Sequence, residues 1–269
     1  MDLADRIERV ETQMITAATE AAHQRVGAAA FVIPVAGGAA CYAEDGSPLN
    51  KIVGLGFGGV PSGEALDEIE RAFAARAVAT QVELTNLADP AIGATLTSRG
   101  YQLVSFENVL GRSLPGELQP VTPPGVEVRL SDDRAAWLDV VVDGFAHPDV
   151  EGVPSHEEFP REILQNVIGD TEQAGATPYL AYRDGIVAGG GSVRLSEGVA
   201  QLTGAATSPA HRRHGVQTAL LSVRLADAAR AGCDIAVVVT QPGSKSQQNV
   251  QRQGFHLLYT RAVLVKSPS

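Results

Sequence analysis

The chain has 269 residues, 44% of them hydrophobic, and a formal net charge of −10. This length suits two domains with packed cores. The negative charge argues against nucleic acid as a partner, because a duplex-binding face must be basic. No stretch approaches the ~20 apolar residues of a membrane span, and the charged N-terminus lacks a signal-peptide core. We therefore expect a cytoplasmic protein with no membrane partner.

The two cysteines, Cys41 and Cys233, form neither a disulfide framework nor a metal-binding spacing. We expect both to be small buried residues. The sequence predicts no metal site.

The first half is expected to alternate helices and strands. Apolar residues at helical spacing open the chain, and later helices begin at Ser or Asp-Pro signals. The expected elements are a helix at 3–25, two strands within 28–43, a strand at 50–57, a helix at 62–77, a strand at 80–87, a helix at 89–100 and a strand region at 101–112.

A stretch rich in Pro and Gly at 113–125 predicts a linker. The domains are therefore expected at 1–112 and 126–269. After the linker we expect a strand at 126–130, a helix capped by Ser131, a helix at 155–168 broken at Pro160, a hairpin through Asp184-Gly185, a strand at 199–207, a helix at 214–231, a strand at 234–240, a short helix at 246–254 and a strand region at 255–266.

The two halves end alike. Aligning Gly100 with Gly254 sets "GYQLVSFENVLGR" against "GFHLLYTRAVLVK", with four of thirteen positions identical. In both halves a helix, an apolar strand and a short helix precede this segment. We interpret this as an internal duplication.

The strongest functional pattern follows the strand that ends at Thr207. Ser208-Pro209 leads into a loop containing Arg212 and Gly215, and a helix follows. The start of a helix has unpaired N–H groups and a positive dipole end, so it favours an anion such as pyrophosphate. Gly215 allows close backbone approach, and arginines add charge-assisted hydrogen bonds. The alternative is that Arg212 and Arg213 are only solvated surface residues.

This pattern resembles the GNAT acetyltransferase superfamily, in which a strand ending in V-x-P leads into [QR]-x-x-G-x-[GA] and a helix. The later "SQQNVQRQGF" resembles that family's motif ending in G-F. The resemblance covers 126–269 and implies an α/β fold (an α+β mixed sheet) with two GNAT-like acyl-CoA N-acyltransferase domains in tandem. It also implies acetyl-CoA as co-substrate, held by Ala206, Thr207, Arg212, Arg213, His214, Gly215, Val216, Gln217, Thr218 and Asn249.

Residues 28–112 resemble a second, degenerate copy of this domain. Its corresponding loop, "GFGGVPSGEALDEI", has no arginine, and its helix begins with Glu64, Asp67 and Glu68. These acids would repel a pyrophosphate. We expect that the first half kept the fold and lost the cofactor loop.

The second half departs from the family pattern at two positions and in one strand. Gln217 stands where the family has Gly or Ala, so its side chain either crowds the phosphates or donates to them. Val250 stands where the family often has a Tyr acid, and the strand 200–207 has no carboxylate base. The candidate replacements are Ser246, which could equally be a helix cap, and Glu157, which could equally be a surface residue.

Charge is unevenly distributed along the second half. Residues 132–162 hold nine acids and two bases, while 201–269 hold eight bases and two acids. The basic segment suits an anionic cofactor, and the acidic segment suits a cationic acceptor. Solvated helix faces would produce the same pattern.

These observations predict an N-acetyltransferase that moves the acetyl group of acetyl-CoA to a primary amine of a cationic small molecule. By the resemblance, the amine attacks the thioester directly in a ternary complex. The alternatives are a non-catalytic acyl-CoA-binding sensor or scaffold, and transfer to a hydroxyl. The sequence leaves a homodimer open.

Overall fold

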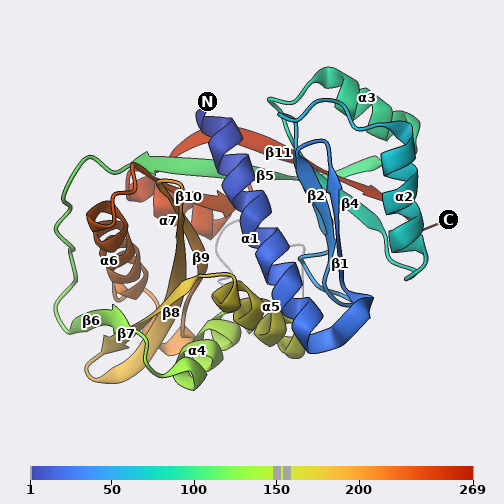
Figure 1. Cartoon of the computed structure of the whole chain (residues 1–269). Coiled ribbons are helices and arrows are strands. Elements are labelled where there is room, and N and C mark those ends of the chain that lie inside the picture. Colours follow the sequence, from blue (N-terminus) through green and yellow to red (C-terminus); the bar gives the residue numbers. More distant parts are fainter. Residues whose placement is uncertain (1, 148–152, 154–158, 269) are drawn as a thin grey trace. The chain divides into compact units, whose positions relative to one another are not determined.

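The computed structural model describes residues 2–147, 153 and 159–268 (Figure 1). Two compact units divide the chain: unit 1 comprises 1–109 and 257–269, and unit 2 comprises 110–256. In the part of the chain that the structure describes, no helix is long and apolar enough to cross a membrane. Cys41 and Cys233 are both buried, which confirms their expected place.

Unit 1 is built on the strand order β1-β2-β3-β4-β11. Strands β1, β2 and β3 pair antiparallel, β3 and β4 pair parallel, and β4 and β11 pair antiparallel. The elements are α1 (Leu3–Val26), η1 (Gly27–Ala29), β1 (Phe31–Val35), β2 (Gly38–Tyr42), β3 (Lys51–Leu55), α2 (Gly63–Ala74), β4 (Thr80–Thr85), α3 (Pro90–Ser98), most of β5 (Gln102–Ser113) and most of β11 (His256–Lys266). Its core packs α2 and α3 side chains such as Phe73 and Leu96 against the sheet.

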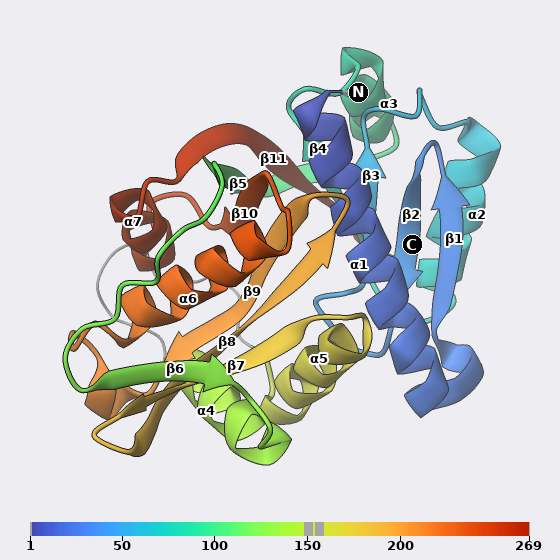
Figure 2. The same cartoon turned by 60° about the vertical axis from the view of Figure 1, so that its left-hand side comes forward.

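Unit 2 has the strand order β10-β9-β8-β7-β6. Strands β9 and β10 pair parallel, and the other neighbours pair antiparallel. The elements are β6 (Val126–Leu130), α4 (Arg134–Ala146), α5 (Arg161–Gln173), β7 (Thr177–Arg183), β8 (Ile186–Ser196), β9 (Val199–Thr207), η2 (Pro209–His211), α6 (Val216–Arg230), β10 (Ile235–Thr240) and α7 (Lys245–Arg252). Helix α6 packs along β8 and β9, and Figure 2 shows this arrangement clearly.

The same element order occurs twice along the chain. In the first half it is α1, β1, β2, β3, α2, β4, α3 and β5, and in the second it is α5, β7, β8, β9, α6, β10, α7 and β11. Each series has three antiparallel strands followed by a parallel one. The tandem fold expected from the sequence is therefore present.

The structure differs from the expected elements in local details. Asp133 caps α4 by accepting from the N–H of Ala136, whereas Ser131, the expected cap, donates its hydroxyl to the carbonyl of Asp133. Helix α7 begins at Lys245 and is capped by Ser244. The turn η2 within the loop before α6 was not anticipated.

The last strand lies in unit 1 rather than with the half that precedes it in sequence. Residues 261–266 of β11 pair with 80–85 of β4 in continuous antiparallel register. Sequence patterns identify a strand but not its partner, so the sequence-based boundary kept 257–269 in the second domain. The contacts place these residues in unit 1.

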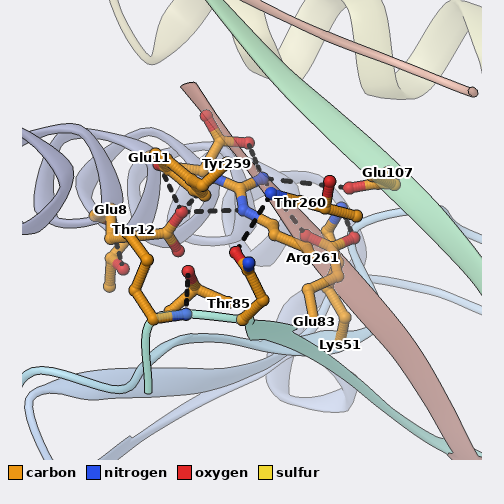
Figure 3. Close-up of polar contacts among 12 residues, drawn as sticks. Glu8, Glu11, Thr12, Lys51, Glu83, Thr85, Glu107, Tyr259, Thr260 and Arg261 are labelled. Atoms are coloured by element: carbon orange, nitrogen blue, oxygen red, sulfur yellow. Dashed lines mark hydrogen bonds and ion pairs between the residues drawn. The ribbon is translucent and has the colours of Figure 1, made fainter. Parts of the chain in front are cut away.

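Buried ionic groups surround Arg261 on β11 (Figure 3). Its guanidinium donates to Glu8 at 2.8 Å, and Glu8 also accepts from the Tyr259 hydroxyl at 2.7 Å. We call the set the Arg261 cluster; it comprises Glu8, Glu11, Lys51, Glu83, Glu107, Tyr259 and Arg261. Four carboxyl groups from α1, β4 and β5 thus face two cations, which favours protonation of one carboxyl group.

That carboxyl group is Glu107. Burial, and then the charge of Glu83, raise its pKa to about 7. Burial also raises the pKa of Glu8, although Arg261 opposes this shift. Although burial alone would lower the pKa of Arg261, the carboxylates of Glu8, Glu11 and Glu83 raise it. The two cations therefore stay charged while Glu107 titrates.

The pKa of Glu107 gives a pH dependence with a defined sign. Because the folded pKa of about 7 exceeds the ordinary value of 4.5, the folded state holds more protons between these pH values. Stability from this group should therefore fall as pH rises from about 4.5 to 7. We expect Glu107→Gln to flatten this slope and to be more stable than the wild type at pH 8. Urea unfolding at pH 5, 6, 7 and 8 measures both; parallel curves for the two proteins would contradict the assignment.

Candidate functional site

Three consecutive glycines of β8, at 189–191, leave no side chains at the centre of the unit 2 sheet, so that neighbouring groups can pack closely against its backbone. A Cβ on Gly190 would lie 2.7 Å from Val141 of α4, whereas a Cβ on Gly191 would lie 3.1 Å from the guanidinium of Arg224 on α6. Gly189 lies against β9, where a Cβ would be 2.7 Å from the carbonyl oxygen of Ala206. Helices α4 and α6 thus approach the sheet closely from opposite faces.

Strands β9 and β10 part after a short paired stretch. Their register covers 199–201 and 235–237, although β9 continues to Thr207 and β10 to Thr240. Extending the register would place Thr240 opposite Gly204, but no such pair forms among the described strand residues. A bulge in β9 accompanies the separation, since Gly190 pairs with Ala206 but Ser192 pairs with Thr203. Gly204 lies in this bulge with a φ of +53°, and bulges bend a strand away from its neighbour.

The first half has an irregularity in the corresponding strand, β3, but it lies in the pairing with β4 and no such separation follows. Gly54 of β3 has a φ of +74°, and the β3–β4 register shifts there. Pairing then resumes at Leu55 with Leu84, at the very end of β3. Thr12 of α1 fills the space beside Gly54, where a Cβ would lie 2.2 Å from its hydroxyl oxygen. We call the unpaired stretch between β9 and β10, after Gln201 and Val237, the slot. Unit 1 has no equivalent between β3 and β4.

The loop after β9 has an unusual backbone. Arg213 has a φ of +64°, which is uncommon for a residue with a side chain, and Gly215 has a φ of +79°. A Cβ on Gly215 would also lie 2.5 Å from Cγ of Pro123, which comes from the linker. Both the dihedral and the packing therefore require glycine at 215. Such non-ideal backbone is typical of ligand-binding loops.

The N-terminus of α6 has no side-chain cap, like those of α1 and α5, whereas α2, α4 and α7 are capped. Its N-cap is Gly215, and no side chain accepts from its first N–H groups. In contrast, Ser62 caps α2 by accepting from Ala65, and Ser244 caps α7 by accepting from Gln247. The free N–H groups and the dipole of α6 suit an anion.

The predicted cations of this loop have different environments. The guanidinium of Arg212 donates to the carbonyl of Thr207 at 3.4 Å and to that of His147 at the end of α4. Arg212 thus ties the loop to β9 and α4. Arg213 and His214 are exposed beside the open helix end.

Two buried hydroxyl groups lie at the ends of the parting strands. Within the described part of the chain, Oγ1 of Thr207 and Oγ1 of Thr240 are buried without a hydrogen-bond partner. Buried polar groups are nearly always paired, so these two fit a polar ligand entering between the strands. Nothing in the sequence distinguished Thr240, because a threonine at a strand end is ordinary.

The other predicted binding residues lie on the same strands and helices. Ala206 is buried against Gly144 of α4, where an added Cβ would be 2.5 Å away. Val216 is buried in the core, while Gln217 and Thr218 are half-buried in the first turn of α6.

The structure gives less support to the predicted catalytic residues than to the predicted cofactor loop. Ser246 is exposed in the first turn of α7 and is not its cap, and Asn249 is half-buried on the same helix. Val250 is 4% exposed and belongs to the hydrophobic core. Glu157 lies outside the described residues. No metal-binding group of three or more His, Cys, Asp or Glu side chains occurs in the described part of the chain.

The comparisons with known proteins agree with this geometry. Residues 141–255 match the model of the acetyltransferase (GNAT) family. A search of curated proteins gives no match.

Several solved structures share the fold. A GCN5-related N-acetyltransferase from Kribbella flavida has a TM-score of 0.63 at 20% identity, covering 94% of this chain and 96% of that one. A tandem GNAT protein from the clavulanic acid biosynthesis pathway has a TM-score of 0.58 at 14% identity, covering 77% and 69%. A GCN5-related N-acetyltransferase from Sphaerobacter thermophilus has a TM-score of 0.56 at 18% identity, covering 76% and 67%.

The family match contains the bulge of β9, the open N-terminus of α6 and the separation of β9 from β10. Residues 141–255 therefore match the acetyltransferase (GNAT) family, and the chain shares the fold of a solved tandem GNAT protein.

Proposed function

We propose that unit 2 binds acetyl-CoA and transfers its acetyl group to a primary amine. The observation that carries the proposal is the slot between β9 and β10, with the uncapped N-terminus of α6 beside its outer end. A family match at 141–255 supports the reaction class. Acetyl-CoA would supply an activated acetyl thioester.

The phosphates are assigned to the loop and first turn of α6. Free N–H groups of residues 216–218 and the exposed Arg213 would hold the pyrophosphate. Gly215 gives the backbone the turn that this contact needs. Arg212 contributes by fixing the loop, since it donates to two backbone carbonyls.

The slot suits an extended chain with amide groups. Residues 202–207 of β9 span about 20 Å at the usual rise of a strand. Beyond Gln201 the β9 backbone has no β10 pair within the described strands. The N–H and C=O groups that would otherwise pair with β10, together with the hydroxyls of Thr207 and Thr240, can bond the amides of a pantetheine arm.

The reaction needs little help from side chains once the partners are aligned. The amine nitrogen bonds to the acetyl carbon, the carbon–sulfur bond breaks, the amine loses a proton and the sulfur leaves as a thiol. A correctly placed neutral amine supplies the nucleophile, and alignment contributes most of the rate. This accounts for a site in which Val250 is core and β9 has no carboxylate.

We propose a cationic acceptor because the segment 132–162 is acidic. Local contacts reduce the charge available, since Asp133 caps α4, Asp139 pairs with Arg161 at 3.2 Å and Asp143 pairs with His147 at 3.3 Å. The remaining acids would provide attraction at long range. Unit 1 is proposed to bind no CoA, because Ser62 closes α2 and β3 stays paired with β4.

The second candidate is a non-catalytic acyl-CoA sensor or scaffold. The core position of Val250 favours it, because this residue cannot donate a proton. We also propose that the protein works in the cytoplasm.

Thiol release separates the two candidates. We expect free thiol on mixing the protein with acetyl-CoA and a panel of polyamines, aminoglycoside-like amines, neutral amines and anionic amines, with polyamines or other cations fastest. Product mass identifies N- or O-acetylation. Tight CoA binding without turnover on any acceptor would favour the sensor, and preference for neutral or anionic amines would exclude the cationic acceptor.

Gly215→Ala should weaken CoA binding by disturbing the loop. Its Cβ meets Pro123 at 2.5 Å and its φ of +79° is unfavourable for alanine. Gly232→Ala is a matched control, because it has a φ of +86° but no atom within 4 Å of the added Cβ. Both should lose about 1 kcal/mol of stability from the dihedral, and Gly215→Ala should lose more. Calorimetric titration with CoA should find at least about tenfold weaker binding only for Gly215→Ala; equal affinities would move the phosphate site elsewhere.

Gln217 tests the first turn of α6. We favour donation from its amide to the phosphates, so Gln217→Ala should weaken CoA binding about threefold to tenfold. Titration with CoA gives the sign directly. Tighter binding would mean that the side chain crowds the loop.

A further inference from the structure

Arg224 is a buried cation on the inner face of α6. Only 1% of its surface is exposed, and all three of its hydrogen bonds go to backbone carbonyls. It donates to Leu220 at 3.0 Å, to Ser192 at 2.8 Å and to Thr203 at 3.4 Å. Among the described residues no carboxylate bonds to it. Burial lowers its pKa to about 10, so the guanidinium stays charged at neutral pH.

Two of the carbonyls that accept from Arg224, those of Ser192 and Thr203, lie beside the bulge of β9. Ser192 pairs with Thr203, and the next pair joins Gly190 to Ala206, so the bulge lies between these two pairs. On the opposite face, the indole of Trp137 donates to the carbonyl of Gly191 at 3.3 Å. Bulges interrupt the regular ladder, and here side chains bond the carbonyls around it. Arg224 therefore bridges β8 and β9 at the bulge.

The sequence of β8 makes room for this guanidinium. A Cβ on Gly191 would lie 3.1 Å from both Cζ and Nη1 of Arg224. The neighbouring Gly190 and Gly189 face other groups, so Gly191 is the glycine that accommodates Arg224. The arginine and the glycine form one packing unit.

The bulge is also where β9 turns away from β10. The peptide between Thr203 and Gly204 has its carbonyl bonded to Arg224, and Gly204 is the residue that an extended register would place opposite Thr240. A charge-assisted bond to a carbonyl polarises the whole peptide group, which strengthens its N–H as a donor. The N–H of this peptide belongs to Gly204, which has no β10 pair among the described strand residues.

We propose that Arg224 is a positioning residue for acetyl transfer, which holds the β9 bulge and strengthens the Gly204 N–H as a donor to the thioester oxygen. This inference rests on the proposed function. Arg224 itself bonds only backbone carbonyls, two of them on β8 and β9, and would act through these strands rather than by contact with the substrate. Negative charge that develops on the oxygen is stabilised by preorganised donors.

Four variants and two measurements test the proposal. Arg224→Met removes the charge and the donors, Arg224→Lys keeps the charge but loses the forked donor geometry of the guanidinium, and Gly191→Ala displaces the guanidinium without removing it. Arg230→Met is the control, since Arg230 is exposed on the same helix and pairs with Asp227. The measurements are steady-state kinetics with acetyl-CoA and amide hydrogen exchange of the protein without ligand.

For Arg224→Met we expect kcat to fall at least about tenfold, with the KM for acetyl-CoA changed less than about threefold. Exchange at 203–206 should accelerate, while exchange in α7 and in unit 1 stays as in the wild type. Gly191→Ala should repeat both effects, Arg224→Lys should be intermediate, and Arg230→Met should match the wild type. If Arg224→Met does not fold, Gly191→Ala and Arg224→Lys carry the test.

Two results would overturn the proposal. One is unchanged exchange at 203–206 in Arg224→Lys and Gly191→Ala, which is decisive even without turnover. The other is accelerated exchange with wild-type kcat, which would make Arg224 purely structural. Absence of turnover by the wild type on every amine would instead refute the proposed function.

Discussion

The geometry of unit 2 depends on one interruption in its sheet, the bulge at Gly204 that separates β9 from β10. Parallel strands normally keep pairing to their ends, and here they stop after Gln201 and Val237. The separation leaves the β9 residues after Gln201 without a β10 pair, and the hydroxyls of Thr207 and Thr240 are buried without a partner among the described residues. These unpaired groups can be stable only where a ligand or water bonds them.

The duplicated half shows that a small local difference closes such a slot. It retains a glycine with positive φ in the matching strand, at Gly54, but the side chain of Thr12 occupies the space beside it and pairing resumes. Its second helix is capped by its own serine. The fold therefore tolerates both an open and a closed version of the same site, and few residues separate them.

Much of the fold was predictable because it depends on local signals. The hairpin at Asp184-Gly185 and the helices after Ser62 and Asp89 follow from turn and capping residues. The loop from Thr207 to Gln217 could also be located, since its glycine, arginines and following helix are adjacent in sequence. Local patterns failed where two acceptable caps compete, as with Ser131 and Asp133.

The remaining features depend on contacts between distant residues. Arg224 looks like an ordinary exposed position of a helix, and its burial follows only from the glycines of β8. The packing of Pro123 on Gly215 joins the linker to the loop, which composition alone did not suggest. The assignment of β11 to unit 1 likewise depends on strand pairing and on the Arg261 cluster.

The position of β11 has a consequence for synthesis of the chain. Ribosomes release domains from the N-terminus onward, and most domains can fold as they emerge. Unit 1 cannot complete its sheet in this way, because β11, which lies between β4 and β5 and carries Arg261, is made after unit 2. Until then, four carboxyl groups of α1, β4 and β5 have only Lys51 as a cation within the cluster. The N-terminal half of the protein therefore reaches its native state only after residues 257–266, which follow all of unit 2, have been made.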